Sequence, residues 1–191
     1  MGSDVKNFMT TADLAAFPDD GNHYELIEGE LFVSYPHDLP HQLIRTNVSF
    51  AIGQYLEQNP IGIVVPEVGV IFSDYDSVIP DTVFVSRERW DTIVDGEYFV
   101  AAPDLVIEIV SSGSENRARD LKIKRKLYGK FGVQEYWAVD LENRSVFIFR
   151  LEGKILKEVS LLTNDDRITS PLFPGLDLQL SEVFQLPREL Y

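Results

Sequence analysis

Three charged residues lie in or beside apolar stretches, and their types could carry out metal-assisted chemistry. Glu108 lies within PDLVIEIVS, Asp81 directly precedes the apolar run TVFV, and Lys124 lies on a predicted helix near residues 115–131. A buried carboxylate is strongly destabilising unless it is paired or binds a cation. Each residue therefore has either a structural partner or a functional one.

Glu108 is the most informative of the three. Because side chains alternate along a strand, its neighbours divide into two apolar faces. Leu105, Ile107 and Ile109 form one face, and Val106 and Val110 form the other together with Glu108. Apolar residues on both faces predict a central strand that is covered on both sides. An internal salt bridge would explain Glu108, but this burial favours a functional carboxylate.

Two aspartates follow prolines at predicted strand starts. Asp81 would share a face with Val83 and Val85, yet Pro-Asp is also ordinary turn chemistry, so a structural and a functional interpretation are equally supported. Asp104 follows Pro103 in the same way, and there the pattern favours a turn or capping role.

The predicted helix over residues 115–131 is the most basic segment of the chain. It holds seven basic and two acidic residues, whereas the whole chain has a net charge of −14. Lys124 and Asp120 fall on the apolar stripe of Leu121, Tyr128 and Phe131. Lys124 would either extend its ammonium to water or serve a site, and the basic run suits an anionic ligand such as a phosphodiester.

An Asp, a Glu and a Lys that converge have a definite chemistry. Carboxylates are hard oxygen ligands for Mg²⁺ or Mn²⁺, and such an ion activates water and neutralises charge on a phosphate. A lysine can orient that water or help to deprotonate it. The three residues therefore suggest phosphodiester hydrolysis, although their spacing alone is not specific.

The elements that must position these residues predict an α/β fold with helices against a sheet, in two or three layers. The helices are expected from Thr10 or Thr11 to Phe17, over His41–Glu57, and over about 115–131 before Gly132. Residues Tyr24–Tyr35 read as a hairpin that turns near Glu28-Gly29. Further strands are expected at Ile63–Phe72, Thr82–Ser86, Asp104–Ser111, Gln134–Asp140 and Ser145–Leu151.

Composition narrows the class of protein. With 191 residues, 45% of them hydrophobic, the chain is expected to form one domain over residues 1–191, with a floppy terminus at residues 1–8. The absence of cysteine excludes disulfides and thiol chemistry. No signal-peptide core or long apolar run occurs, which predicts a cytoplasmic location. The negative charge argues against a generic nucleic-acid binder.

Other familiar sites are not supported. His37 and His41 lie four residues apart, but Pro40 between them argues against a helical zinc pair, so His41 is expected to be a cap or a pocket-lining residue. The sequence contains no glycine-rich phosphate loop and no Gly-x-Ser-x-Gly nucleophile elbow.

Several segments together resemble the putative restriction endonuclease family, long catalogued as a domain of unknown function, within the PD-(D/E)XK nuclease superfamily. PDTVFV at 80–85 is similar to the superfamily's PD strand, and PDLVIEIVSS at 103–112 to its (D/E)XK strand. The similar flanking segments are YELIEGEL at 24–31, Pro36 with His41, Asp120…Lys124…Tyr128 with GVQEYWAVD at 132–140, and PLFPGLDLQLSEVF at 171–184.

The resemblance implies a restriction-endonuclease-like mixed central β-sheet flanked by helices. It implies that Asp81 and Glu108 hold Mg²⁺ or Mn²⁺, with the Ile109 carbonyl as a third ligand. The superfamily's lysine would fall at Val110, so the resemblance assigns its role to Lys124 on the next helix. Glu25 matches an acidic position that assists metal or water, although an exposed hairpin charge explains it equally well.

The resulting expectation is a Mg²⁺-dependent endonuclease that cuts nucleic acid, DNA rather than RNA, after weak or transient binding. The alternative is a catalytically degenerate nuclease fold that acts as an interaction or regulatory module. A metal-dependent hydrolase of a smaller phosphate ester is a third option. Apolar C-terminal strands and exposed aromatic residues are also compatible with a homodimer.

Overall fold

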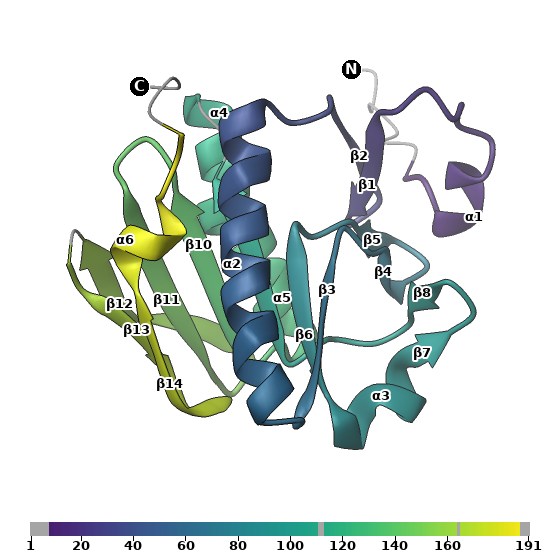
Figure 1. The fold of residues 1–191 in the computed structure, drawn as a ribbon. Coiled ribbons are helices and arrows are strands. Elements are labelled where there is room, and N and C mark those ends of the chain that lie inside the picture. Colours follow the sequence, from purple (N-terminus) through teal and green to yellow (C-terminus); the bar gives the residue numbers. More distant parts are fainter. Residues whose placement is uncertain (1–7, 111–112, 164, 188–191) are drawn as a thin grey trace.

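Two six-stranded sheets organise the chain (Figure 1). The structure is a computed structural model that describes residues 8–110, 113–163 and 165–187. The central sheet has the order β12-β11-β10-β9-β6-β3, in which β9 and β10 are parallel and the other neighbours are antiparallel. Its strands are β3 (Gly62–Pro66), β6 (Thr82–Ser86), β9 (Leu105–Val110), β10 (Glu135–Asp140), β11 (Ser145–Glu152) and β12 (Ile155–Thr163).

The second sheet has the order β2-β1-β5-β4-β8-β7 and contains most of the N-terminal strands. These strands are β1 (His23–Ile27), β2 (Glu30–Ser34), β4 (Val70–Ser73), β5 (Asp76–Val78), β7 (Val94–Asp95) and β8 (Tyr98–Phe99). The β1–β2 turn has positive φ at both Glu28 (52°) and Gly29 (75°), the conformation that a two-residue hairpin turn requires. A third, two-stranded sheet pairs β13 (Arg167–Ser170) with β14 (Phe173–Gln179).

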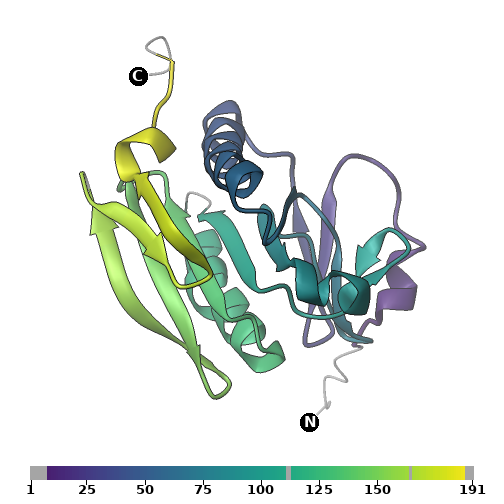
Figure 2. The same ribbon diagram turned by 60° about the horizontal axis from the view of Figure 1, so that its bottom comes forward.

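One long helix and one composite helix cover the central sheet. The long helix is α2 (Leu39–Gln58), and the composite helix consists of α4 (Ser114–Ala118), the π-helical segment η1 (Arg119–Lys124) and α5 (Arg125–Phe131). In Figures 1 and 2, α2 lies on one face of the sheet and α5 on the other. The short helices are α1 (Thr11–Leu14), α3 (Arg87–Ile93) and α6 (Leu180–Val183). No helix in the described ranges is long and apolar enough to cross a membrane.

The two faces of β9 pack into different cores. Leu105, Ile107 and Ile109 contact the core formed with α2, whereas Val106 and Val110 belong to the core that includes Tyr128 of α5. The alternation that was predicted for this strand is therefore confirmed, and it leaves Glu108 on the α5 side. Both faces of the sheet are covered, as in a three-layer arrangement.

Most predicted elements are present, but the predicted strand Ile63–Phe72 is wrong. The chain leaves the central sheet after Pro66, adopts positive φ at Glu67 (53°), and enters the second sheet as β4. The elements that were not predicted are strands β5, β7, β8, β12, β13 and β14 and helices α3 and α6. Of the predicted floppy terminus only Phe8 is described, and Ser111, the predicted end of β9, lies outside the described residues.

Candidate functional site

The antiparallel pairing of β6 with β9 brings Asp81 and Glu108 together. Thr82 pairs with Ile107, so Asp81 immediately before β6 and Glu108 immediately after Ile107 are next in the register. Both side chains are buried. The Asp81 carboxylate accepts a hydrogen bond from the Ile109 backbone N–H at 2.7 Å, which ties the start of β6 to β9.

Lys124 reaches Glu108 from the composite helix. Its Nζ donates to Glu108 Oε1 at 2.9 Å and to Glu25 Oε1 at 3.0 Å, and its side chain is only 4% exposed. The interpretation that this ammonium extends into water is therefore wrong. Lys124 ends η1, and π-helical segments inside α-helices occur frequently at functional sites.

Glu25 belongs to the same cluster although it comes from the second sheet. It lies on β1, it is buried, and its Oε1 also accepts a hydrogen bond from the Ile79 backbone N–H at 2.9 Å. Glu25 is thus not an exposed hairpin charge. It connects the second sheet to the central sheet through the ammonium of Lys124.

Burial sets the protonation of Glu108. Removal from water, with the nearby Asp81 and Glu25, raises the pKa of Glu108 to about 8 in spite of the lowering effect of the Lys124 ammonium. Tyr128 of α5 donates its hydroxyl to Glu108 Oε1 at 2.5 Å, the same oxygen that Lys124 contacts. Two donors therefore fix one oxygen of this carboxylate.

The pKa of Lys124 is shifted in the opposite direction to that of a lone buried lysine. Burial by itself lowers the pKa of this ammonium, but the carboxylates of Glu108 and Glu25 raise it above its usual value. Lys124 is therefore a cation at neutral pH, which favours a role as hydrogen-bond donor and positive charge over the role of proton acceptor.

Asp81 is held in its ionised form. Burial raises the pKa of this carboxyl, but the hydrogen bonds from His41 and the Ile109 N–H, with the field of His37, bring the pKa below its ordinary value. His41 Nε2 lies 3.4 Å from Asp81 Oδ2 and 3.2 Å from the Ile109 carbonyl oxygen. One imidazole thus contacts two of the three atoms that the family resemblance assigns to a metal.

A small polar cavity of about 10 Å³ joins these residues, which is close to the space of one water-sized occupant. Its lining includes Glu25, Asp81, Glu108, Ile109, Asp120 and Lys124. A much larger open cleft of about 590 Å³ lies beside it, and both share Ser34, His37 and Arg119 in their lining. The cleft therefore gives the buried acids a route to solvent.

The donor set fits a hard divalent cation. Two carboxylates and a backbone carbonyl bordering a cavity of this size are oxygen ligands of the kind that Mg²⁺ and Mn²⁺ take, with the remaining positions left for water. Asp81, Glu108 and the carbonyl of Ile109 would hold such an ion, and Glu25 lies within the same lining.

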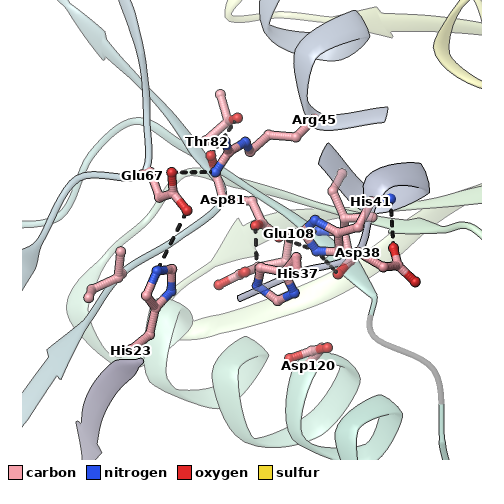
Figure 3. Close-up of polar contacts among 12 residues, drawn as sticks. His23, His37, Asp38, His41, Arg45, Glu67, Asp81, Thr82, Glu108 and Asp120 are labelled. Carbon is pink, nitrogen blue, oxygen red and sulfur yellow. Dashed lines mark hydrogen bonds and ion pairs between the residues drawn. The ribbon is translucent and has the colours of Figure 1, made fainter. Parts of the chain in front are cut away.

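The histidines are arranged differently from the expectation drawn from Pro40. Proline is tolerated in the first turn of a helix, and α2 begins at Leu39 with Pro40 next, so His41 remains helical. The rings of His37 and His41 stack with centroids 3.7 Å apart, and Figure 3 shows both beside Asp81. His37 lies before the helix, so the two residues do not form a helical pair, but their rings nevertheless lie together.

The basic residues of the composite helix do not form one face. Arg117 and Arg119 line the open cleft, and Arg117 pairs there with Asp140. Elsewhere Lys126 pairs with Glu28, and Lys130 pairs with Asp76. Of the basic residues of this helix, those that line the cleft are Arg117 and Arg119.

Asp104 has the structural role that its Pro-Asp context favoured. Its carboxylate accepts hydrogen bonds from the Ser86 backbone N–H at 2.8 Å and from Arg89 at 2.9 Å. It fixes the junction between β6 and α3 and lies outside the lining of both cavities.

Sequence reasoning assigned no site role to three residues that border the cluster: Asp120, Tyr128 and His37. Asp120 and Tyr128 lie four residues to either side of Lys124, and that spacing was the available signal. His37 precedes α2 without any periodic pattern, so nothing local indicated that it would face Asp81.

The fold places the chain in a known class. It is similar to the crystal structure of a putative nuclease belonging to DUF820 from Anabaena variabilis ATCC 29413, with a TM-score of 0.75 and 22% identity over 92% of this chain and 97% of that chain. The chain therefore shares the fold of that protein, an α/β fold with mixed sheets flanked by helices.

The sequence then identifies the family. The model of Uma2, described as putative restriction endonuclease, matches residues 11–181, and the chain belongs to this family. No curated protein matches the sequence.

Proposed function

We propose that this protein is a nuclease that hydrolyses phosphodiester bonds of nucleic acid with the help of a divalent cation, Mg²⁺ or Mn²⁺. The observation that carries the proposal is the convergence of Asp81, Glu108 and Lys124 on one small cavity beside an open cleft. Membership of a family described as restriction endonucleases supports the same reaction class and favours DNA over RNA as substrate.

Each side chain has a distinct task in this proposal. A bound divalent ion would supply positive charge to the scissile phosphate and make water more acidic. Asp81 and Glu108 offer carboxylate oxygens on adjacent strands, and the hydrogen bonds to Asp81 keep that carboxylate ionised. Tyr128 and Lys124 fix Glu108 Oε1, so this side chain does not have to reorganise during the reaction.

Lys124 would act by its charge. As an ammonium it can donate a hydrogen bond to the attacking water or to a phosphate oxygen, and it stabilises negative charge that develops in the transition state. Glu25 holds Lys124 from the opposite side at 3.0 Å, which makes Glu25 a positioning residue.

The cleft is the proposed path for the substrate. Arg117 and Arg119 line it, but so do Asp38, Asp140 and Glu142, and the chain carries a net charge of −14. This mixed lining favours brief, weak engagement of a polyanion over tight autonomous binding.

Metal binding tests the proposal without a choice of substrate. We would titrate Mn²⁺ by calorimetry into wild type, Asp81→Asn and Glu108→Gln, and then assay Mg²⁺-dependent cleavage of plasmid DNA and of RNA. Binding and cleavage are expected in wild type, with affinity at least about tenfold weaker and cleavage lost in both variants. Asp177→Asn is the matched control, because Asp177 is exposed and lies outside both cavity linings.

A second function has one specific observation in its favour. Glu108, Lys124, Glu25 and Tyr128 already form a hydrogen-bonded buried network, as a degenerate nuclease fold used as an interaction module would have. Absence of Mn²⁺ binding up to millimolar concentration, together with absence of cleavage, would overturn the nuclease proposal and favour this module. Metal binding without cleavage of either polymer would instead favour a smaller phosphate ester as substrate.

A further inference from the structure

Two of the three histidines of the chain, His37 and His41, lie beside Asp81, and the third, His23, lies near His37 and pairs with Glu67 (Figure 3). His37 and His41 stack at 3.7 Å with an interplanar angle of 2°, and His23 lies edge-on to His37 at 6.1 Å between ring centroids. Nε2 of His37 is 3.9 Å from Asp81 Oδ1, and Nε2 of His41 is 3.4 Å from Asp81 Oδ2. Two imidazoles thus present the same nitrogen to the two oxygens of one carboxylate.

The start of α2 holds this arrangement in place. Asp38 caps the helix by accepting a hydrogen bond from the His41 backbone N–H at 3.0 Å, which fixes the turn that carries both histidines. His41 is buried, and the side chain of His37 is 18% exposed. His37 borders both the small cavity and the open cleft, so an ion from solvent can reach the three ligands.

We propose that His37, His41 and Asp81 form a binding site for a borderline transition-metal ion such as Zn²⁺. One ligand atom from each residue lies within 4.8 Å of the others, a separation that small side-chain rotations can close around one ion. Two imidazole nitrogens and one carboxylate suit Zn²⁺ and related ions and leave a position open, whereas Mg²⁺ prefers oxygen ligands alone.

Metal binding at His41 requires that its Nε2 carry no hydrogen. His41 Nε2 contacts the Ile109 carbonyl at 3.2 Å, and because a carbonyl only accepts, this nitrogen carries hydrogen in the metal-free state. For Nε2 to become a ligand, the hydrogen must leave to solvent or move to Nδ1. Nδ1 is buried and has no hydrogen-bond partner among the described residues, so no contact there fixes the tautomer.

This inference does not rest on the nuclease proposal, but the two sites share Asp81. The oxygen-ligand site needs Glu108, and the imidazole site needs His37 and His41. Substitution of Glu108 should therefore affect only the first site, substitution of His37 only the second, and substitution of Asp81 both. The failure of one proposal can in this way be distinguished from the failure of the other.

The three histidines make the test direct. We would label the full chain with ¹⁵N, remove metals with chelator, and follow the six ring nitrogens by NMR as Zn²⁺ is added to one equivalent. Saturable shifts of Nε2 in both His37 and His41 are expected, with His23 as the internal control. Zn²⁺ that shifts neither ring, or that shifts His23 while leaving His41 unchanged, would overturn the inference.

Variants provide a second measurement of affinity. Competition of Zn²⁺ with a colorimetric chelator should show at least about a tenfold loss in His37→Ala, and no more than about a twofold change in His23→Ala or Glu108→Gln. His37 is the less buried member of the stacked pair, so its replacement disturbs the core less than replacement of His41 would. Equal Zn²⁺ affinity in His37→Ala and wild type would contradict the site.

Discussion

The burial of Glu108 illustrates how a functional site lowers the stability of the folded chain. Two buried acids, Glu25 and Glu108, contact the ammonium of Lys124, and a third buried acid, Asp81, lines the same small cavity. Excess negative charge at low dielectric destabilises the folded chain, and proteins tolerate such groups mainly where function requires them. Replacing a carboxylate and replacing the lysine should therefore have opposite effects on stability.

Glu108→Gln should stabilise the metal-free protein in alkaline solution. The pKa of Glu108 rises from 4.5 to about 8 on folding, so the folded chain retains a proton that the unfolded chain loses between these pH values. This group's contribution to stability is complete below pH 4.5 and is lost as pH rises through 8. Glu108→Gln should not show this loss. At pH 8.5 its free energy of unfolding should therefore exceed that of wild type by about 1 kcal/mol or more.

Urea unfolding at several pH values between 4.5 and 9 would measure the difference between Glu108→Gln and wild type. Groups that do not interact with Glu108 titrate equally in both proteins, so the difference reports the titration of Glu108 together with the groups coupled to it. A difference that does not change with pH would contradict the predicted proton uptake.

Lys124→Met should have the opposite effect. The change leaves Glu25 and Glu108 buried without their shared ammonium, and removing one partner of a buried ion pair costs about 3–5 kcal/mol. Thermal unfolding in the absence of metal would measure this loss of stability. Lys126→Met is the matched control, because Lys126 is exposed on the same helix and pairs only with an exposed Glu28. Similar losses in both variants would refute the predicted role of burial.

The residues of the site differ in how far the sequence could predict them. Glu108 and Lys124 stood out because charges in apolar patterns are costly, and that argument needs only local spacing. Glu25 was singled out through the family resemblance, since its partner Lys124 is 99 residues away. His37 and Tyr128 were missed as site residues because their importance depends on long-range contacts with Asp81 and Glu108.

At the scale of elements, the composite helix positions both Lys124 and Tyr128. Gly129 lies in α5 where a Cβ would be 3.0 Å from the Lys154 carbonyl oxygen and 3.1 Å from the Leu156 amide nitrogen. Both neighbours are backbone atoms near the start of β12 and cannot move aside cheaply. This close approach keeps α5 against the sheet and Tyr128 against Glu108.

Two helical glycines should therefore respond differently to alanine. Gly53→Ala in α2 meets no atom within 4 Å and should stabilise by about 1 kcal/mol through helix propensity. Gly129→Ala should destabilise by about 1–3 kcal/mol by overpacking. Melting temperatures would rise by about 2–4 °C for the first and fall for the second. A rise in the melting temperature of both variants would show that helix propensity outweighs the close contact at Gly129.

Element prediction succeeded where the pattern was long and failed where strands change sheets. The hairpin, α2, β6, β9 and β10 follow from apolar periodicity and turn residues. Residues 63–72 read as one strand because both halves are apolar, and the sheet change at Glu67 is fixed by tertiary contacts. The π-helical segment was also beyond a spacing argument, because the apolar spacing was compared with the turn of an α-helix and nothing in it marks the wider π turn.

At the scale of the whole molecule, the net charge of −14 limits how a polyanion is bound. Only Arg117 and Arg119 were identified as basic residues lining the cleft. Two phosphate contacts predict that the logarithm of DNA affinity falls with the logarithm of salt concentration at a slope of about −2. Arg119→Ala should reduce the slope to about −1.

Fluorescence anisotropy of a labelled duplex in chelator, which prevents metal-dependent cleavage, would measure this slope between 50 and 200 mM salt. A slope steeper than about −5 would indicate a basic surface beyond this cleft. The homodimer stays a prediction, and exposed Ile155, Val159 and Leu161 on the edge strand β12 are the apolar residues to replace in testing it.

The wide spacing of the acids and the lysine also has a consequence for timing during synthesis. Glu25, Asp81, Glu108 and Lys124 come from four segments spread over a hundred residues of chain. A nascent chain in which residue 124 is still inside the ribosome lacks the Lys124 ammonium between Glu25 and Glu108. It also lacks the Tyr128 hydroxyl that donates to Glu108. Any activity that depends on this cluster would therefore begin only after the chain has been made and released beyond Tyr128.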